Sequence, residues 1–248
     1  ISIPLVGLGT LAAWWQRRPS RTLAALGVCL LVPALIGTYA THVAPYRLRD
    51  DRVTLTVPAD RVGPKGLRIA VLADLQLNTV TDYEREALDD VMEAEPDVIV
   101  IAGDLFQGSA ADLDREVEAY RDMLGGLSAP GGVYVVPGDV DGFSGELERL
   151  VAGTDVEILE DEVARFQVNG TRVALGGVRL DWRTESARAV FTELEATPAD
   201  ELAVLLSHRP DTVLDLPPDS RVDLVAAGHT HGGQVALPGF GPITTLSE

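Results

Sequence analysis

Residues 97–106 read DVIVIAGDLF, an unbroken apolar run that ends in Gly-Asp, and this stretch decides the fold. Residues 67–73 (LRIAVLA) and 202–207 (LAVLLS) have the same unbroken apolar character. A strand with one solvated face alternates polar and apolar residues, whereas a strand buried on both faces is apolar throughout. The three runs therefore predict central strands of an α/β fold, with helices packed on both sides.

Shorter strand-like and helix-like segments fill the rest of residues 53–227. Asn169-Gly170 between two strand-like runs is a strong hairpin signal, and an antiparallel pair makes its sheet mixed. We therefore predict two sheets in a layered sandwich. The expected strands are residues 53–57, 67–73, 97–102, 132–136, 156–159, 162–168, 171–178, 201–207 and 222–227, and the expected helices are about 82–94, 112–124, 144–152 and 184–195.

The N-terminal 45 residues have the character of a membrane anchor. Residues 22–41 carry no charge, and as a helix they would extend about 30 Å, the thickness of a bilayer's hydrocarbon core. A second apolar stretch, residues 1–15, ends in Trp14 and Trp15, residue types that favour the membrane interface. We predict transmembrane helices in residues 1–45, the first one truncated, over the alternatives of a buried core helix or a signal peptide.

The loop between these apolar stretches, QRRPSR at residues 16–21, is purely basic. Basic loops favour the cytoplasmic side, which would place the downstream domain on the extracytoplasmic side of the cell membrane. Arg47, Arg49 and Arg52 on the other flank count against this orientation.

Charge is distributed unevenly between the two parts. The chain has 38 acidic and 20 basic residues and a net charge of −18, yet residues 1–49 hold five arginines and no acid. Nucleic-acid binding needs clustered Lys and Arg, so we expect no nucleic acid as a partner. A single cysteine, Cys29, excludes an internal disulfide and a cysteine-based zinc site.

An Asp or His follows five of the predicted strands. Open α/β sheets place their sites at the carboxyl ends of strands, so these residues should meet at one edge. Carboxylates and imidazoles together suit Mn²⁺, Fe or Zn²⁺ better than Ca²⁺ or Mg²⁺. Each residue alone has an ordinary explanation as a cap or turn former, but their coincidence predicts a di-metal or degenerate di-metal site. The residues are Asp74, Asp104, Asp139 with Asp141, His208, and His229 with His231.

The order of these motifs resembles the calcineurin-like metallophosphoesterases, and in particular their membrane-anchored bacterial phosphodiesterase branch. The matching segments are DLQ (74–76), GDLF (103–106), GDVD (138–141), SHRPD (207–211) and GHTHGGQ (228–234). The resemblance covers residues 50–248 and implies the layered α/β/β/α sandwich of two mixed sheets typical of that family. It also implies that the strands that close the second sheet are missing after residue 248.

Carried over by position, the resemblance implies two divalent metal ions, with Mn²⁺ preferred and Fe or Zn²⁺ as alternatives. Asp74, Asp104 and His231 would hold the first ion and Asp104, Asp139, His208 and His229 the second, with Asp104 bridging. The last four would also form the catalytic set.

Two positions depart from the family pattern. Gln76 stands where the family has a metal-binding His, and its amide oxygen would be a weaker ligand. Val140 stands where the family has the His that contacts substrate and assists the leaving group. A general acid is worth about 10²–10⁴-fold in rate, so a leaving group that needs no proton should be favoured.

These observations lead to two hypotheses of different classes. The first is a phosphoesterase that cleaves a phosphodiester or pyrophosphate bond through a hydroxide bridging two metal ions. Its substrate would be a phosphoester, lipid-linked or from the cell envelope, at the membrane. The alternative is a catalytically weakened domain that acts as a membrane-tethered binding or scaffold protein, for which Gln76 and Val140 are the evidence.

Overall fold

A computed structural model describes residues 21–48, 50–141, 145–231, 236–237 and 241–242. The chain divides into two compact units, residues 1–54 and residues 55–248. Each unit is considered separately below.

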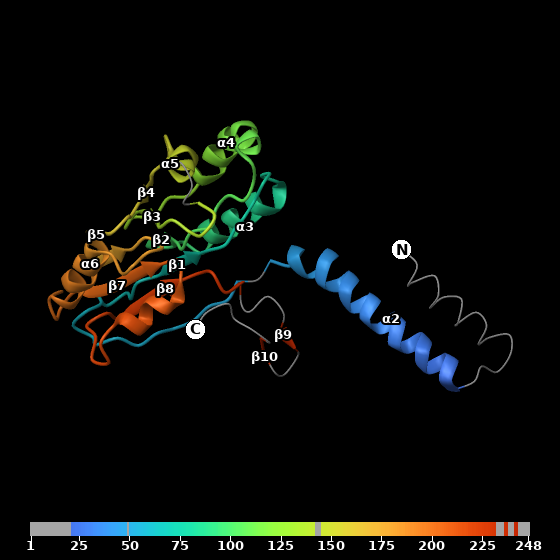
Figure 1. Cartoon of the computed structure of the whole chain (residues 1–248). Coiled ribbons are helices and arrows are strands. Elements are labelled where there is room, and N and C mark those ends of the chain that lie inside the picture. Colours follow the sequence, from blue (N-terminus) through green and yellow to red (C-terminus); the bar gives the residue numbers. More distant parts are fainter. Residues whose placement is uncertain (1–20, 49, 142–144, 232–235, 238–240, 243–248) are drawn as a thin grey trace. The chain divides into compact units, whose positions relative to one another are not determined.

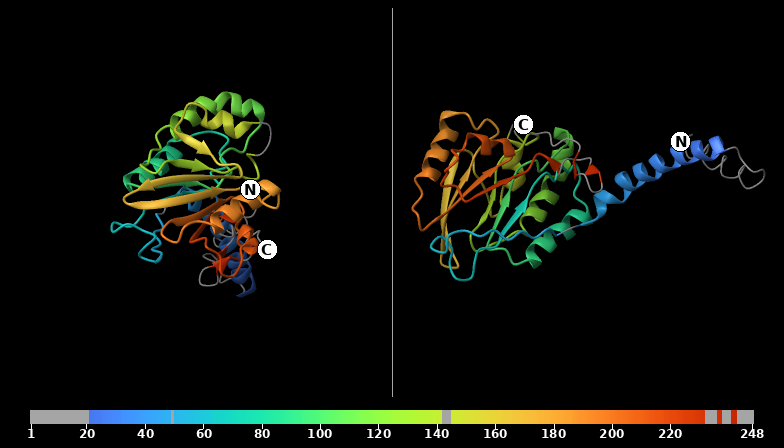
Figure 2. Two further views of the ribbon diagram at one scale, coloured as in Figure 1. Left: turned by 90° about the vertical axis from the view of Figure 1, so that its left-hand side faces the viewer. Right: turned by 90° about the horizontal axis from the view of Figure 1, so that it is seen from below.

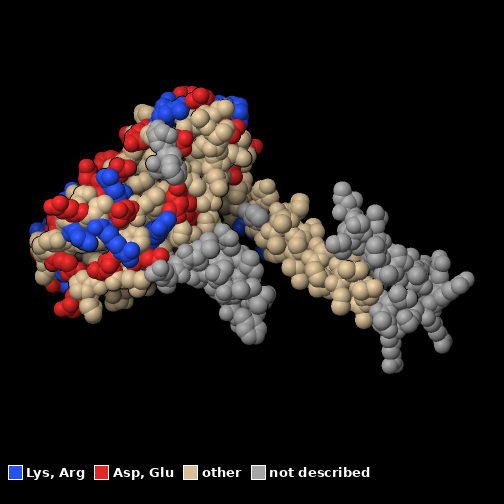
Figure 3. Space-filling view, in the orientation of Figure 1, with Lys and Arg blue, Asp and Glu red and all other residues tan. Residues whose placement is uncertain are grey.

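The N-terminal unit contains one long apolar helix, α2 (Arg21–His42), followed by the 3₁₀ turn η1 (Ala44–Tyr46). Within α2, residues 25–42 have a mean hydropathy of 1.5 and are only 6% buried. Most side chains on this helix carry no charge (Figure 3). The helix is long and apolar enough to cross a membrane, as expected for residues 22–41. The expected first apolar stretch, with Trp14 and Trp15, lies outside the described residues.

The first sheet of the larger unit contains four strands in the order β1-β2-β3-β4. Every pairing is parallel, from Ile69 opposite Val98 to Val135 opposite Ile158. This differs from the mixed sheet that we expected, because successive strands of this sheet are joined by crossover connections rather than hairpins. The strands are β1 (Ile69–Leu72), β2 (Val98–Ile101), β3 (Val133–Val135) and β4 (Val156–Ile158).

The second sheet also has four strands, in the order β5-β6-β7-β8, and it is mixed as predicted. Strands β5 and β6 pair antiparallel, while β6–β7 and β7–β8 are parallel. Asn169 and Gly170 form the hairpin turn with φ of 50° and 79°, the left-handed values that a two-residue turn requires. The strands are β5 (Glu162–Val168), β6 (Thr171–Gly177), β7 (Leu202–Ser207) and β8 (Leu224–Ala227).

The two sheets face each other across an apolar layer, which includes Val100, Leu175 and Val204. Helices cover the outer face of each sheet (Figures 1 and 2). On the first sheet, α4 contributes Leu113 and α5 contributes Leu147 to one core cluster, and on the second α6 contributes Val190. The helices are α3 (Asp82–Glu93), α4 (Ala110–Leu124), α5 (Glu146–Val151) and α6 (Glu185–Glu195). The predicted α/β/β/α layering is therefore confirmed.

Two local features differ from the sequence prediction. Residues 53–57, expected as a strand, are not assigned to one, and Val53 and Leu55 are 80% and 58% exposed. These residues have β-propensity, but no neighbouring strand pairs with them among the described residues. A strand needs hydrogen bonds to a neighbouring strand. The second feature is unpredicted structure after β7 and β8, namely the 3₁₀ helix η2 (Pro210–Asp215) and a short antiparallel pair, β9 (Ala236–Leu237) with β10 (Gly241–Pro242).

The layer between the sheets can be tested at Leu175, which is 1% exposed. Replacing it with Ala should lower the free energy of unfolding by about 2–5 kcal/mol, because the substitution removes buried methyl groups and leaves a cavity. Urea unfolding followed by circular dichroism measures the change. Leu214→Ala is the matched control, since Leu214 is 65% exposed and should change stability by less than about 0.5 kcal/mol. Equal losses in the two variants would contradict this packing.

Candidate metal centre

Five of the predicted site residues converge where the two sheets meet. Asp139, His208 and His229 form one group whose ligand atoms lie within 4.8 Å of one another, and Asp74, Asp104 and His208 form a second. His208 belongs to both groups. Asp74, Asp104 and Asp139 follow strands of the first sheet, whereas His208 and His229 follow β7 and β8 of the second. The site is therefore built from both sheets.

The imidazole of His208 is buried, with 1% of the residue exposed. Its Nδ1 lies 2.7 Å from the carbonyl oxygen of Ala102 at the end of β2. A carbonyl oxygen only accepts, so Nδ1 carries the proton and, in the neutral ring, Nε2 carries the lone pair. Such a second hydrogen bond is how proteins orient a metal-binding histidine.

The lone pair of His208 faces negative charge. Nε2 is buried without a hydrogen-bond partner among the described residues. It lies 3.5 Å from Oδ2 of Asp104 and 3.6 Å from Oδ2 of Asp139. Two ligand atoms on a tetrahedral ion with bonds of about 2.1 Å would be about 3.4 Å apart. In the neutral ring, a lone pair aimed at two carboxylates is repulsive unless a cation lies between them, so these residues fit a divalent metal ion.

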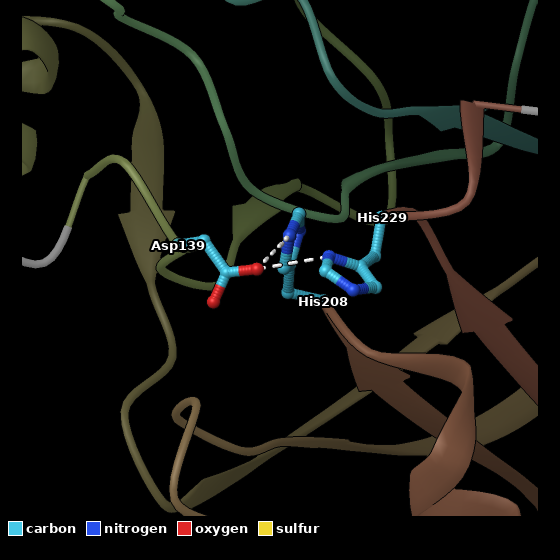
Figure 4. Close-up of side chains that lie close together, drawn as sticks. All are labelled: Asp139, His208 and His229. Atoms are coloured by element: carbon cyan, nitrogen blue, oxygen red, sulfur yellow. Dashed lines mark ion pairs between the residues drawn. The ribbon is translucent and has the colours of Figure 1, made fainter. Parts of the chain in front are cut away.

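His229 completes this group. Its Nδ1 lies 2.8 Å from the same Asp139 Oδ2 that faces His208, and the two imidazole rings stand edge to face with centroids 5.2 Å apart. Figure 4 shows both rings directed at one carboxylate oxygen of Asp139. Two nitrogens and two carboxylates are the donor set that Mn²⁺, Fe and Zn²⁺ accept.

Asp74 and Gln76, from the loop after β1, border the same centre. Oδ1 of Asp74 lies 3.9 Å from Nδ1 of His208 and accepts a hydrogen bond from the His229 backbone N–H at 3.0 Å. The side-chain amide of Gln76 donates to Oδ2 of Asp104 at 2.7 Å, so its nitrogen faces the carboxylate. The predicted ligand role of the Gln76 oxygen therefore stays a prediction.

His231 is the predicted histidine ligand that the structure does not bring into either group. It is exposed, and it immediately precedes Gly232 and Gly233, which lie outside the described residues. Its ligand role also stays a prediction.

The backbone at the site is strained. Eight described non-glycine residues have positive φ, and five of them are predicted site residues. Left-handed conformations cost about 1 kcal/mol or more for residues other than glycine and persist where the surroundings enforce them. Their concentration at one edge indicates a site whose side-chain positions are held against local preference. The five are Asp74 (φ 55°), Gln76 (46°), Asp104 (57°), His229 (69°) and His231 (47°).

The glycines of the two Gly-Asp motifs allow these loops to touch. A Cβ on Gly138 would lie 2.2 Å from both the backbone nitrogen and Oδ1 of Asp104, and one on Gly103 would lie 2.6 Å from the Gly138 nitrogen. Only glycine can occupy either position without moving a ligand.

Asp141 joins the loops that follow β2 and β3 through hydrogen bonds to their backbone. Its Oδ1 accepts hydrogen bonds from the backbone N–H of Leu105 and Phe106, and its Oδ2 accepts one from Gly138. Burial raises the pKa of this carboxyl above its usual value, while the three backbone donors oppose the shift. The sequence placed Asp141 at the strand end without a role, and the structure makes it a loop anchor.

Sequence reasoning missed Arg209. Its guanidinium forms an ion pair with Oδ1 of Asp139, on the side away from the two imidazoles. Its position directly after His208 is the only sequence signal that could have identified it.

Comparison with known proteins agrees with the geometry. Residues 67–233 match the sequence model of the calcineurin-like phosphoesterases. An uncharacterized metallophosphoesterase of Aquifex aeolicus is 28% identical over 88% of this chain and 83% of its own length. A bovine transmembrane protein with metallophosphoesterase domain is 29% identical over 91% of the chain and 55% of its own length.

A third relative carries a specific activity in its name. The UDP-2,3-diacylglucosamine pyrophosphatase LpxG of Chlamydia trachomatis is 24% identical over 87% of this chain and 78% of its own length. The chain spans about half the length of several other curated relatives that it matches.

The anchoring role of Asp141 predicts a graded loss of stability. Asp141→Ala leaves three buried N–H groups unpaired, at about 1–3 kcal/mol each before relaxation and relief of the buried charge, so we expect a net loss of about 2–4 kcal/mol. Asp141→Asn keeps the oxygen that faces Leu105 and Phe106 and should lose less. Chemical unfolding of the metal-free proteins measures both, with Asp114→Ala, an exposed carboxylate, as control. Equal stability of all three variants would rule out the anchor.

Proposed function

This chain belongs to the calcineurin-like phosphoesterase family, and we propose that it is a metal-dependent hydrolase of a phosphodiester or pyrophosphate bond. The observation that carries the proposal is the lone pair of His208, buried between the carboxylates of Asp104 and Asp139. Without a cation this arrangement is unfavourable, so it does not stabilise the metal-free domain.

Four residues would hold one divalent ion, namely Asp104, Asp139, His208 and His229. A second ion would lie between Asp104 and Asp74, with Gln76 and His231 as further ligands. Bound ions of this kind bind phosphoryl oxygens as Lewis acids and lower the pKa of a water held between them. Mn²⁺ is the ion we propose for the assay, because it accepts both carboxylate and imidazole ligands.

The protein's own groups orient the carboxylate of Asp104, which is the proposed bridging ligand. Val140 N–H donates to Oδ1 of Asp104 at 2.9 Å while Gln76 donates to Oδ2. These donors orient both carboxylate oxygens and offset part of the charge of a residue that is only 2% exposed. Gln76 thus stabilises the carboxylate that would join the two ions.

The side chain of Val140 has no proton to give, although its backbone N–H is used at the site. A leaving group that departs as a stable anion should therefore react best. Phosphate is such a leaving group, which favours a pyrophosphate bond or an activated diester. The activity named for the Chlamydia trachomatis relative, that of a UDP-2,3-diacylglucosamine pyrophosphatase, supports a pyrophosphate bond as the target.

The apolar helix α2 supports a membrane location for the domain. Its length and hydropathy suit a span, and one relative is described as a transmembrane protein with the same domain. We propose residues 1–45 as the anchor of a domain that starts near residue 50, on the extracytoplasmic side as the basic loop favours. A substrate embedded in or released from the membrane would suit this position.

Metal content separates the enzyme from the scaffold alternative. Mass spectrometry of the full chain dialysed against Mn²⁺ should find one to two ions per chain, and Asp104→Asn and His208→Ala should each lower this number. The same variants should lose at least about 100-fold in turnover of a generic diester, the scale of a lost catalytic group. Asp114→Asn is the control for loss of a surface carboxylate. Fewer than one ion per chain, with no turnover that depends on Asp104, would favour the scaffold.

The missing general acid predicts a steep dependence on the leaving group. Across a series of aryl phosphodiesters, turnover should fall as the pKa of the leaving phenol rises, because the departing oxygen receives no proton. Restoring a histidine with Val140→His should flatten this dependence. Equal rates across the series in the unmodified protein would contradict the proposal.

A further inference from the structure

A small pocket lies beside Arg209, next to the candidate metal centre. It has a volume of about 290 Å³ and is lined by Leu180, Asp181, Trp182, Arg183 and Arg209. Four of these residues come from the connection between β6 and α6, and Arg209 lies at the start of η2. Arg209 also forms an ion pair with Asp139, so one side chain of the lining contacts a predicted metal ligand.

Arg209 has capacity for a second partner. One terminal nitrogen contacts Asp139 and Nε is buried, but the side chain is 40% exposed, so a second partner can reach its remaining terminal N–H groups. A guanidinium offers five N–H donors in one plane and binds carboxylate and phosphate in the same way. A cation bound by Asp139 would weaken this ion pair, since the carboxylate charge would then be shared, and would free donors for an anion.

Arg183 supplies a second positive charge to the pocket. Its guanidinium lies 5.2 Å from the ring centroid of Trp182 and 3.6 Å from Asp215. Trp182 is itself fixed, because it is buried and its indole N–H donates to Asp215. Cation–π contact therefore holds an otherwise exposed side chain at the pocket.

The lining favours an anion over an aromatic or apolar group. The Trp182 ring is buried and covered by Arg183, so little of it remains for stacking. Asp181 is the one acidic side chain of the lining, and its carboxylate accepts a hydrogen bond from the Arg183 backbone N–H at 3.3 Å. Two arginines line the pocket against one carboxylate. Each arginine also pairs with a carboxylate outside the lining, Arg209 with Asp139 and Arg183 with Asp215, and a cation bound by Asp139 would release Arg209 for an anion.

We infer that Arg209 and Arg183 form an anion subsite that receives a second phosphate group, joined directly to the phosphorus that is attacked. This inference rests on the proposed function and narrows it to pyrophosphate-linked substrates. In the reaction, a water oxygen bonds to the first phosphorus and the bond from that phosphorus to the bridging oxygen breaks. The bridging oxygen leaves with the electron pair on the second phosphate, and the proton lost by the water passes to solvent.

The positive charge of the subsite would replace the general acid that Val140 cannot provide. The negative charge that develops during this step falls on the second phosphate, beside two guanidinium groups, so stabilisation needs no proton transfer. Arg209 and Arg183 are therefore specificity-determining residues that contact the leaving group.

Ligand binding to the full chain in detergent tests the subsite without turnover. The probes are imidodiphosphate, whose P–N–P bridge resists hydrolysis, and orthophosphate, each titrated calorimetrically into Mn²⁺-loaded protein. The unmodified chain should bind imidodiphosphate more tightly, and Arg183→Gln and Arg209→Gln should each reduce this preference by about tenfold, the value of one charge-assisted hydrogen bond. Arg188→Gln, an exposed arginine on α6 outside the pocket, should leave the preference unchanged.

Mn²⁺ affinity is a second measurement, in which Arg209→Gln should strengthen binding rather than weaken it. Arg209→Gln should bind Mn²⁺ several-fold more tightly, because the ion no longer competes with a guanidinium for Asp139. A role for Arg209 limited to holding Asp139 in place predicts weaker Mn²⁺ binding instead, and that result would overturn the inference. Arg183→Gln should leave Mn²⁺ affinity unchanged, since Arg183 has no contact with a predicted ligand among the described residues.

The outcomes also separate this inference from the proposed function. If the unmodified chain binds Mn²⁺ and orthophosphate and cleaves a generic diester but shows no preference for imidodiphosphate, the subsite alone is wrong. The subsite is likewise wrong if both glutamine variants keep the full preference. If the unmodified chain binds neither Mn²⁺ nor orthophosphate, the proposed function fails and the subsite fails with it.

Discussion

The hydrogen bond between Nδ1 of His208 and the carbonyl oxygen of Ala102 is the contact on which the candidate site depends. It joins the end of β7 in one sheet to the end of β2 in the other, and it fixes which ring nitrogen faces the carboxylates. A second contact makes the same connection, since the His229 backbone N–H donates to Oδ1 of Asp74. The two sheets thus meet at their carboxyl ends through polar groups, while an apolar layer holds them together elsewhere. The position of the candidate metal centre at this edge follows from how the layers are connected.

Much of this arrangement could be predicted from local patterns. Unbroken apolar runs such as 98–101 indicate strands buried on both faces, and the Asp or His after each run indicates the site. Contacts between distant loops could not be predicted in this way. The segment 53–57 has strand propensity, yet a strand also needs a neighbour, which propensity does not report. The hydrogen bond that the Gln76 amide nitrogen donates to Asp104 is such a contact. Arg209 was overlooked because its importance comes from an ion pair with a residue 70 positions away.

The net charge of the whole domain is negative, whereas the charge at the proposed substrate site would be positive. The domain as a whole is strongly acidic, and its visible surface mixes acidic and basic side chains without a basic face (Figure 3). Phosphate esters are anions, so the domain repels its proposed substrates at a distance. Locally the sign would be reversed by bound cations and by the two arginines of the pocket. Selectivity would then rest on a small positive region within an acidic surface, which discourages polyanions while admitting a compact phosphate.

The left-handed backbone at five site residues links metal supply to the amount of folded protein. At about 1 kcal/mol each, these conformations together cost an amount comparable with the lower end of a whole domain's stability. Ions that bind only the folded state would offset this cost by mass action. A chain made in a metal-poor cell would then spend more time unfolded and be removed by proteases. The abundance of the protein, as well as its activity, would then depend on the concentration of free metal, because each copy would survive longer when metal is available.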